Sequence, residues 1–174
     1  MARAIHIAPA ASIRYETKVR LVAGMLAGFI ASLSIVGVVT AILVVTGNDI
    51  WTAVRLIATS VYGQQAAIGW LPIVAGTILH LVTGTFFGAV FASLVPRMPA
   101  NIYVVAGLIY GLLTWVVMAL LILPLVAPLL VATNINVAVL LLAHVVYGFV
   151  LGIAGGIIEL LWAIPKTAKL QAGT

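Results

Sequence analysis

Residues 71–95 read LPIVAGTILHLVTGTFFGAVFASLV and contain no Asp, Glu, Lys or Arg. The hydrocarbon core of a bilayer is about 30 Å thick, and about 20 apolar residues of helix are needed to cross it. This stretch therefore predicts a membrane-spanning helix. Outward from it, three more apolar runs of similar length lie at residues 21–45, 103–123 and 137–162, and Glu159 in the last is their one charged residue. The sequence thus predicts an all-α integral membrane four-helix bundle.

The composition agrees with a membrane protein, because only 6% of the 174 residues are charged and 65% are hydrophobic. Soluble domains carry about a quarter charged residues. These numbers exclude a soluble enzyme and a nucleic-acid partner. The absence of cysteine removes disulfides, thiolate metal sites and thiol catalysis. We find no catalytic motif and no metal-ligand motif, so we expect a protein that is not an enzyme.

The basic residues indicate the orientation of the chain. Seven of the eight fall on one side of the predicted spans, and only Arg55 falls on the other. The seven are Arg3, Arg14, Lys18, Arg20, Arg97, Lys166 and Lys169. The positive-inside rule places that side in the cytoplasm. Residues 1–20 and 165–174 are then cytoplasmic tails, and residues 21–164 form the four-span domain.

The connection between the first two spans predicts a further helix, at about residues 49–62, on the external surface. Its apolar residues share one face at helical spacing. They are Ile50, Val54, Ile57, Ala58 and Val61. Asn48 or Asp49 can cap its start, and Gly63 can close it. We expect an amphipathic helix that lies in the membrane interface.

Two sequence segments recur in the same order, which indicates an internal repeat. Residues 22–28, VAGMLAG, resemble residues 105–111, VAGLIYG, and residues 80–88, HLVTGTFFG, resemble residues 144–152, HVVYGFVLG. Each unit would hold two spans, so the fold would be a tandem 2+2 helix repeat about an axis along the membrane normal. His80 and His144 would then lie at matching depths.

Small residues at four-residue spacing predict the packing faces of the helices. Helices in lipid associate by close backbone contact, which glycine permits. The predicted helix-packing glycines are Gly24, Gly28, Gly76, Gly84, Gly88, Gly107, Gly111, Gly148, Gly152 and Gly156.

His80 and His144 are the candidate site residues, because an ionisable group inside a span usually faces protein and has a partner. In one interpretation each imidazole bonds a hydroxyl or carbonyl on a neighbouring helix. In a second, the two are axial ligands of one haem b, and Arg55 contacts its propionates. In a third, they belong to a proton or ion path.

A small channel or carrier would need a continuous polar path across the bundle. The few candidates are Ser32, Ser34, Thr83, Thr85, Thr114 and Glu159, the last being the one acid within a span. They are thinly spread, so this alternative ranks last.

The order of motifs, ending in residues 143–152, AHVVYGFVLG, resembles a group of small four-span bacterial membrane proteins of unknown function. The resemblance covers about residues 20–160. It implies the fold and a location in the bacterial inner membrane, and it carries no functional residue.

The function that we expect is that of a non-catalytic accessory or structural subunit in a larger bacterial membrane complex, of respiratory or photosynthetic electron transport. Its partners would be other membrane subunits and the lipid bilayer. The sequence assigns no cofactor and leaves haem b open, so a bis-histidine haem b electron carrier is the alternative.

Overall fold

The computed structural model describes residues 10–96, 98–128 and 137–171, with side chains from residue 17 to residue 158 except at residue 100. Within these ranges the chain is helical and has no strand. Four helical segments are long and apolar enough to cross a membrane. The elements are α1 (Ala10–Val45), α2 (Thr52–Tyr62), the 3-10 turn η1 (Gly63–Ala67), α3 (Leu71–Leu94), α4 (Ala100–Val117), the π segment η2 (Met118–Ile122), α5 (Leu123–Val126) and α7 (Val137–Gln171).

Two spans continue through prolines, beyond the ends at residues 123 and 162 that we expected from the sequence. The third runs from α4 through η2 and α5 to Val126, and so passes Pro124. Pro124 lies in the first turn of α5, where its missing N–H costs least, and the π segment before it absorbs the change in hydrogen bonding. α7 likewise passes Pro165 and ends at Gln171. Prolines are tolerated in membrane helices when such local adjustments satisfy the backbone.

Glycine ends both α1 and α2. At the end of α1, Gly47 has a φ of 88°, and its N–H donates to the Val44 carbonyl at 3.0 Å. The Asn48 N–H donates to the Leu43 carbonyl at 2.8 Å, which completes a Schellman motif. Gly63 closes α2 with a φ of 56°. Only glycine takes up these conformations without a steric cost.

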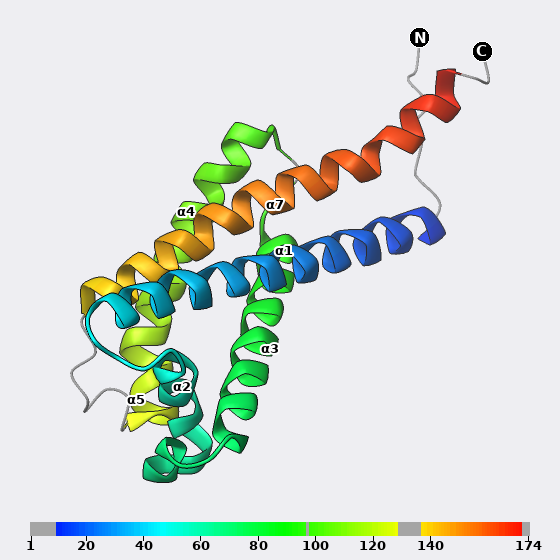
Figure 1. Ribbon diagram of the computed structural model, residues 1–174. Coiled ribbons are helices and arrows are strands. Elements are labelled where there is room, and N and C mark those ends of the chain that lie inside the picture. The colour runs from blue at the N-terminus through cyan, green and yellow to red at the C-terminus, as the bar shows by residue number, and fades with distance from the viewer. Residues whose placement is uncertain (1–9, 97, 129–136, 172–174) are drawn as a thin grey trace.

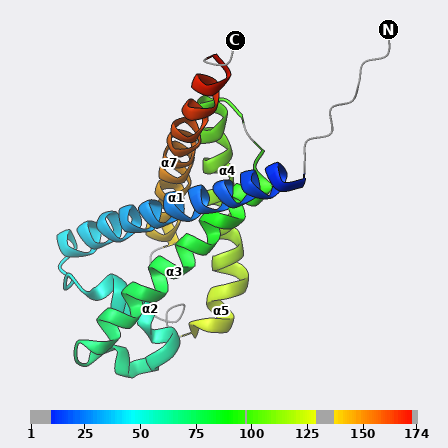
Figure 2. The same cartoon turned by 90° about the vertical axis from the view of Figure 1, so that its right-hand side faces the viewer.

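The long helices cross one another rather than lying parallel, as Figures 1 and 2 show from two sides. α1 packs on α3, α4 packs on α7, and α1 also contacts α7. The short helix α2 lies against the first turns of α3 (Figure 1). The start of α1 is fixed to the end of α3, because Arg20 Nη2 donates to the carbonyls of Ala92, at 2.7 Å, and Val95, at 2.6 Å.

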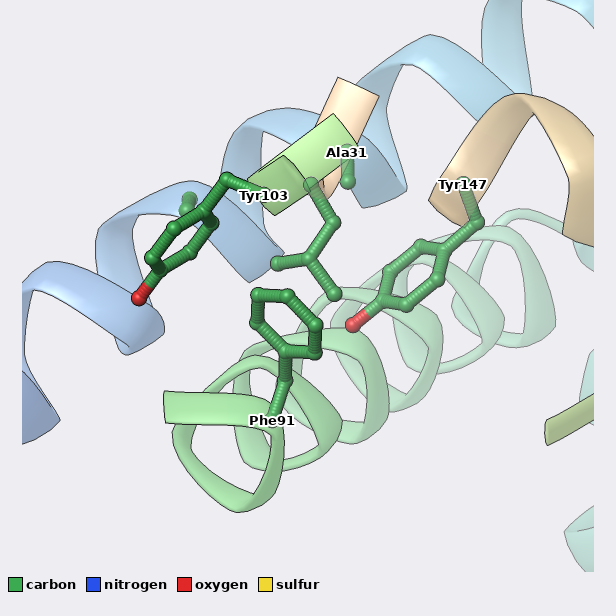
Figure 3. Close-up of a cluster of buried hydrophobic side chains, with 6 residues drawn as sticks. Ala31, Phe91, Tyr103 and Tyr147 are labelled. Carbon is green, nitrogen blue, oxygen red and sulfur yellow. The ribbon is translucent and has the colours of Figure 1, made fainter. Parts of the chain in front are cut away.

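The described core lies where α1, α3, α4 and α7 meet. Its buried members are Ala27, Ala31, Phe91, Tyr103, Tyr147 and Leu151. Figure 3 shows Phe91 between the rings of Tyr103 and Tyr147. The Phe91 and Tyr103 rings meet edge to face, with centroids 5.6 Å apart. Aromatic side chains thus fill the space that small residues on α1 leave.

Candidate functional site

Glycines make the crossing of α1 and α3. A Cβ on Gly28 would overlap the carbonyl oxygen of Gly84 and would lie 2.8 Å from Gly88 Cα. A Cβ on Gly24 would lie 2.5 Å from the Gly88 carbonyl oxygen. Real Cβ atoms do not approach backbone this closely, so the two backbones touch only because these side chains are absent.

A second glycine crossing joins α4 and α7. A Cβ on Gly107 would overlap the Gly148 carbonyl and would lie 2.8 Å from Gly152 Cα. A Cβ on Gly111 would overlap the His144 carbonyl. The helix that carries His144 is therefore held by backbone contact directly at the histidine.

Gly76 serves a third contact, between α3 and the short helix α2. A Cβ there would overlap the Val54 carbonyl and would lie 3.2 Å from the Ala58 N. Val54 and Ala58 are buried in this contact. Further along α7, Gly155 packs close to α4, because a Cβ there would lie 3.2 Å from Tyr103 Cε1. The packing role of Gly156 stays a prediction.

Between the crossing helices lies a partly open cavity of about 510 Å³, lined by residues of α1, α2, α3, α4, η2, α5 and α7. His80 and His144 both line it. The two histidines that sequence comparison placed in equivalent positions therefore face one space. Most of the remaining wall is aliphatic or aromatic, and no Asp, Glu, Lys or Arg is among the described residues that line it.

Each histidine uses one ring nitrogen on a backbone carbonyl. His80 Nε2 lies 3.1 Å from the Ser32 carbonyl oxygen, across the α1–α3 crossing. His144 Nδ1 lies 2.8 Å from the Leu140 carbonyl oxygen, one turn earlier in α7. A carbonyl only accepts, so these nitrogens carry the protons. His80 is thus tied to another helix, and His144 is tied to its own.

Hydroxyl groups and the side chain of Asn48 add to the polar part of the wall. Tyr147 donates to the Gly84 carbonyl at 2.7 Å, and Thr114 donates to the Tyr110 carbonyl at 2.8 Å. Thr83 also lines the cavity, and no hydrogen bond of its hydroxyl is found among the described residues. The Tyr147 bond was not foreseen from the sequence, because it needs a bare glycine carbonyl on the facing helix.

Arg55 lies on α2 and bonds the turn that follows this helix. Its Nη1 donates to the Ala66 carbonyl and its Nη2 to the Gly69 carbonyl, both at 3.0 Å. Arg55 is not among the described residues that line the cavity. The guanidinium holds the turn between α2 and α3, and the predicted contact with a haem propionate remains untested.

The ring orientations do not fit a bis-histidine haem. His144 Nε2 is free to ligate, because Nδ1 makes the backbone bond that commonly orients a ligating imidazole. His80 has the opposite orientation, with Nε2 already on the Ser32 carbonyl. Symmetric ligation would require that bond to break and the ring to turn.

Three of the six candidates for a polar path, Ser32, Ser34 and Thr114, bond a carbonyl of their own helix. Ser32 donates to the Gly28 carbonyl at 2.8 Å and Ser34 to the Ile30 carbonyl at 3.1 Å. The side chain of Glu159 lies outside the described residues, as does Arg97. Among the residues that the structure describes, no cluster of three His, Asp or Glu side chains could hold a metal ion.

The fold and the cavity together define an all-α, multi-pass membrane protein with four apolar helices. The chain belongs to the family of unknown function DUF6789, which matches residues 19–167. The sequence had indicated membership of such a family. Searches of curated proteins and of solved structures found no significant match.

Proposed function

We propose that the protein is a non-catalytic accessory subunit of a larger complex in the bacterial inner membrane. The observation that carries this proposal is the large apolar surface at the external end of the helices. Leu125 and Trp70 are 76% and 71% exposed there, and Ile68 is 73% exposed. These side chains lie in or next to connections between spans, where a contact with another apolar surface stabilises them. A respiratory or photosynthetic electron-transport complex is the class that we favour.

The internal repeat belongs to this proposal. Two glycine crossings with the same atoms in contact support it, namely Gly28 on Gly84 and Gly88, and Gly107 on Gly148 and Gly152. Gly84 with Gly148, and Gly88 with Gly152, are the pairs that the sequence repeat matches. The sequence repeat matches Gly24 with Gly107. In the contacts, however, Gly28 has the position that corresponds to Gly107, one helical turn after Gly24. The 2+2 repeat that we propose therefore includes a one-turn shift of the first helix.

We place α2 in the external interface of the membrane. Its buried face packs on α3, while Val61 is 67% exposed and Trp51 is 47% exposed. Tryptophan is enriched at the level of the lipid headgroups. An apolar surface and an indole at one end of the bundle support an interfacial position.

Both termini face the cytoplasm in this proposal. The start of α1 and the end of α3 lie on one side, because Arg20 bonds the last carbonyls of α3. Seven of the eight basic residues belong to that side in the sequence. The positive-inside rule then assigns it to the cytoplasm.

Photocrosslinking in native membranes tests the subunit proposal. Benzoylphenylalanine replaces Trp70 or Leu125, two strongly exposed side chains of the apolar surface on which the proposal rests. We expect at least one position to give a single crosslinked polypeptide of fixed mass in high yield, and the same polypeptide to remain with the chain in mild detergent. Crosslinks to lipid alone at both positions would refute the proposal.

A further inference from the structure

The cavity holds two nitrogen atoms whose hydrogen-bonding capacity the described protein does not use. A neutral imidazole, the form that an apolar wall favours, has one N–H and one lone pair. His80 donates through Nε2 to Ser32, and His144 donates through Nδ1 to Leu140. The lone pairs of His80 Nδ1 and His144 Nε2 therefore remain as acceptors on two rings that line one space.

The chemistry of this wall selects a particular kind of ligand. A volume of about 510 Å³ lies within the range of small-molecule sites, which are mostly apolar with a few placed polar groups. The two imidazole nitrogens that remain accept hydrogen bonds, so a ligand that uses both of them must donate to both. The Thr83 hydroxyl lies in the same wall and can donate or accept.

We propose that the cavity binds a lipid-soluble hydroquinone, whose two phenolic hydroxyls donate to His80 Nδ1 and His144 Nε2. An apolar ring and tail suit the aliphatic and aromatic remainder of the wall. The corresponding quinone has only carbonyl acceptors, which would face the two lone pairs without a proton between them. The site therefore binds the reduced form more tightly than the oxidised form.

The outer part of the cavity suits the apolar substituent of such a ligand. Leu43 at the end of α1 and Leu56 of α2 line it, together with Leu123 at the start of α5. The first and last of these elements meet the external loops, so the cavity extends from the histidines toward that end of the bundle. The assignment is independent of whether the chain is a subunit of a complex.

The test uses the full chain, purified in detergent and kept anaerobic with a reductant. The probe is decylhydroquinone, and its control is the bis-methyl ether, which has the same ring and tail but no hydroxyl donor. Binding is followed by equilibrium dialysis and by the ¹⁵N resonances of the imidazoles. We expect one hydroquinone per chain, at least tenfold weaker binding of the ether, and shifts of the His80 and His144 resonances with that of His6 unchanged.

Two variants separate the histidines from general packing. His144→Phe removes the acceptor and keeps a flat ring, and we expect a loss of at least tenfold in hydroquinone affinity. His6→Phe is the matched control, because His6 precedes the first span. If His144→Phe fails to fold, the imidazole resonances of the unmodified chain still decide the question.

Three results would overturn the proposal. Equal affinity for the ether would show an apolar cavity that takes lipid or detergent without recognising a donor. Hydroquinone binding that leaves both imidazole resonances unmoved would place the ligand elsewhere. A Soret band in the purified chain that disappears in His144→Phe would assign the space to haem.

Discussion

At Gly28 the packing of α1 on α3 requires that the residue has no Cβ atom. The position lies on the face of α1 that meets α3, and a methyl group there would overlap a carbonyl oxygen of the facing helix. Neighbouring backbone cannot move away without separating the two helices. The same argument holds at Gly107 on α4, whereas a Cβ at Gly37 on α1 would meet no described atom within 4 Å. The cost of replacing a glycine in these helices therefore depends on which atoms lie next to it.

Gly28→Ala should destabilise the protein by about 1–3 kcal/mol, the usual cost of overpacking a close contact. The matched control is Gly37→Ala in the same helix, because among the described atoms a Cβ at Gly37 would meet nothing within 4 Å. That change should be neutral or slightly stabilising, since alanine favours helix. Thermal unfolding in detergent measures both. Equal stability of the two variants would contradict the assigned crossing.

Tyr147→Phe should lower the stability by about 0.5–1.5 kcal/mol, because it removes the donor to the Gly84 carbonyl and keeps the ring. Bonds of this kind between membrane helices have average coupling energies of about 0.6 kcal/mol, so the lower half of the range is expected. The control is Tyr62→Phe at the end of α2. Unfolding by a denaturing detergent measures the stability of both variants. Equal stability would contradict a stabilising hydrogen bond between Tyr147 and Gly84.

Among the elements, α2 has the most unusual position. It is too short to span a bilayer, yet its backbone touches α3 at Gly76 and it forms part of the cavity wall. Arg55 on α2 holds the following turn through two carbonyls, those of Ala66 and Gly69. The planar guanidinium can reach both at once because its N–H groups form a rigid fork. Arg55 therefore holds α2 and the turn that follows it together as one unit.

Arg55→Gln should loosen this unit. The backbone amides of residues 63–70 should exchange with deuterium faster, by roughly an order of magnitude if about 1.4 kcal/mol of local stability is lost. Exchange in α3 beyond Gly76 should not change. Arg55→Lys is the comparison, since an ammonium lacks the fork and should restore only part of the protection. Unaltered exchange in both variants would show that the loop is held by other contacts.

For the molecule as a whole, the distribution of basic residues and the packing of the helices support the same orientation in the membrane. Arg20 joins the first part of α1 to the end of α3, and α2, which carries Arg55, lies at the other end of the bundle (Figure 2). The chain has no cysteine, so a single introduced thiol reports its own side of the membrane.

Gln64→Cys should react with a membrane-impermeant maleimide in intact cells, and Thr17→Cys should react only after the membrane is opened. Both positions have exposed side chains, so access to the reagent depends on the side of the membrane and not on burial. Labelling is read by mass shift on a gel. The reverse pattern would invert the proposed topology and place both termini outside the cytoplasm.

The sequence alone was sufficient to predict a membrane protein with four apolar helices, because crossing a bilayer requires long runs without charge and these are visible residue by residue. It also singled out His80 and His144, since an ionisable side chain in such a run is conspicuous. Tertiary structure decided what the sequence left open. Which ring nitrogen of His80 faces the Ser32 carbonyl, and where Arg55 donates, depend on atoms that are not neighbours in the chain. The spacing of the glycines predicted the packing faces, but only the contacts between crossing helices show which faces meet and how they form the cavity.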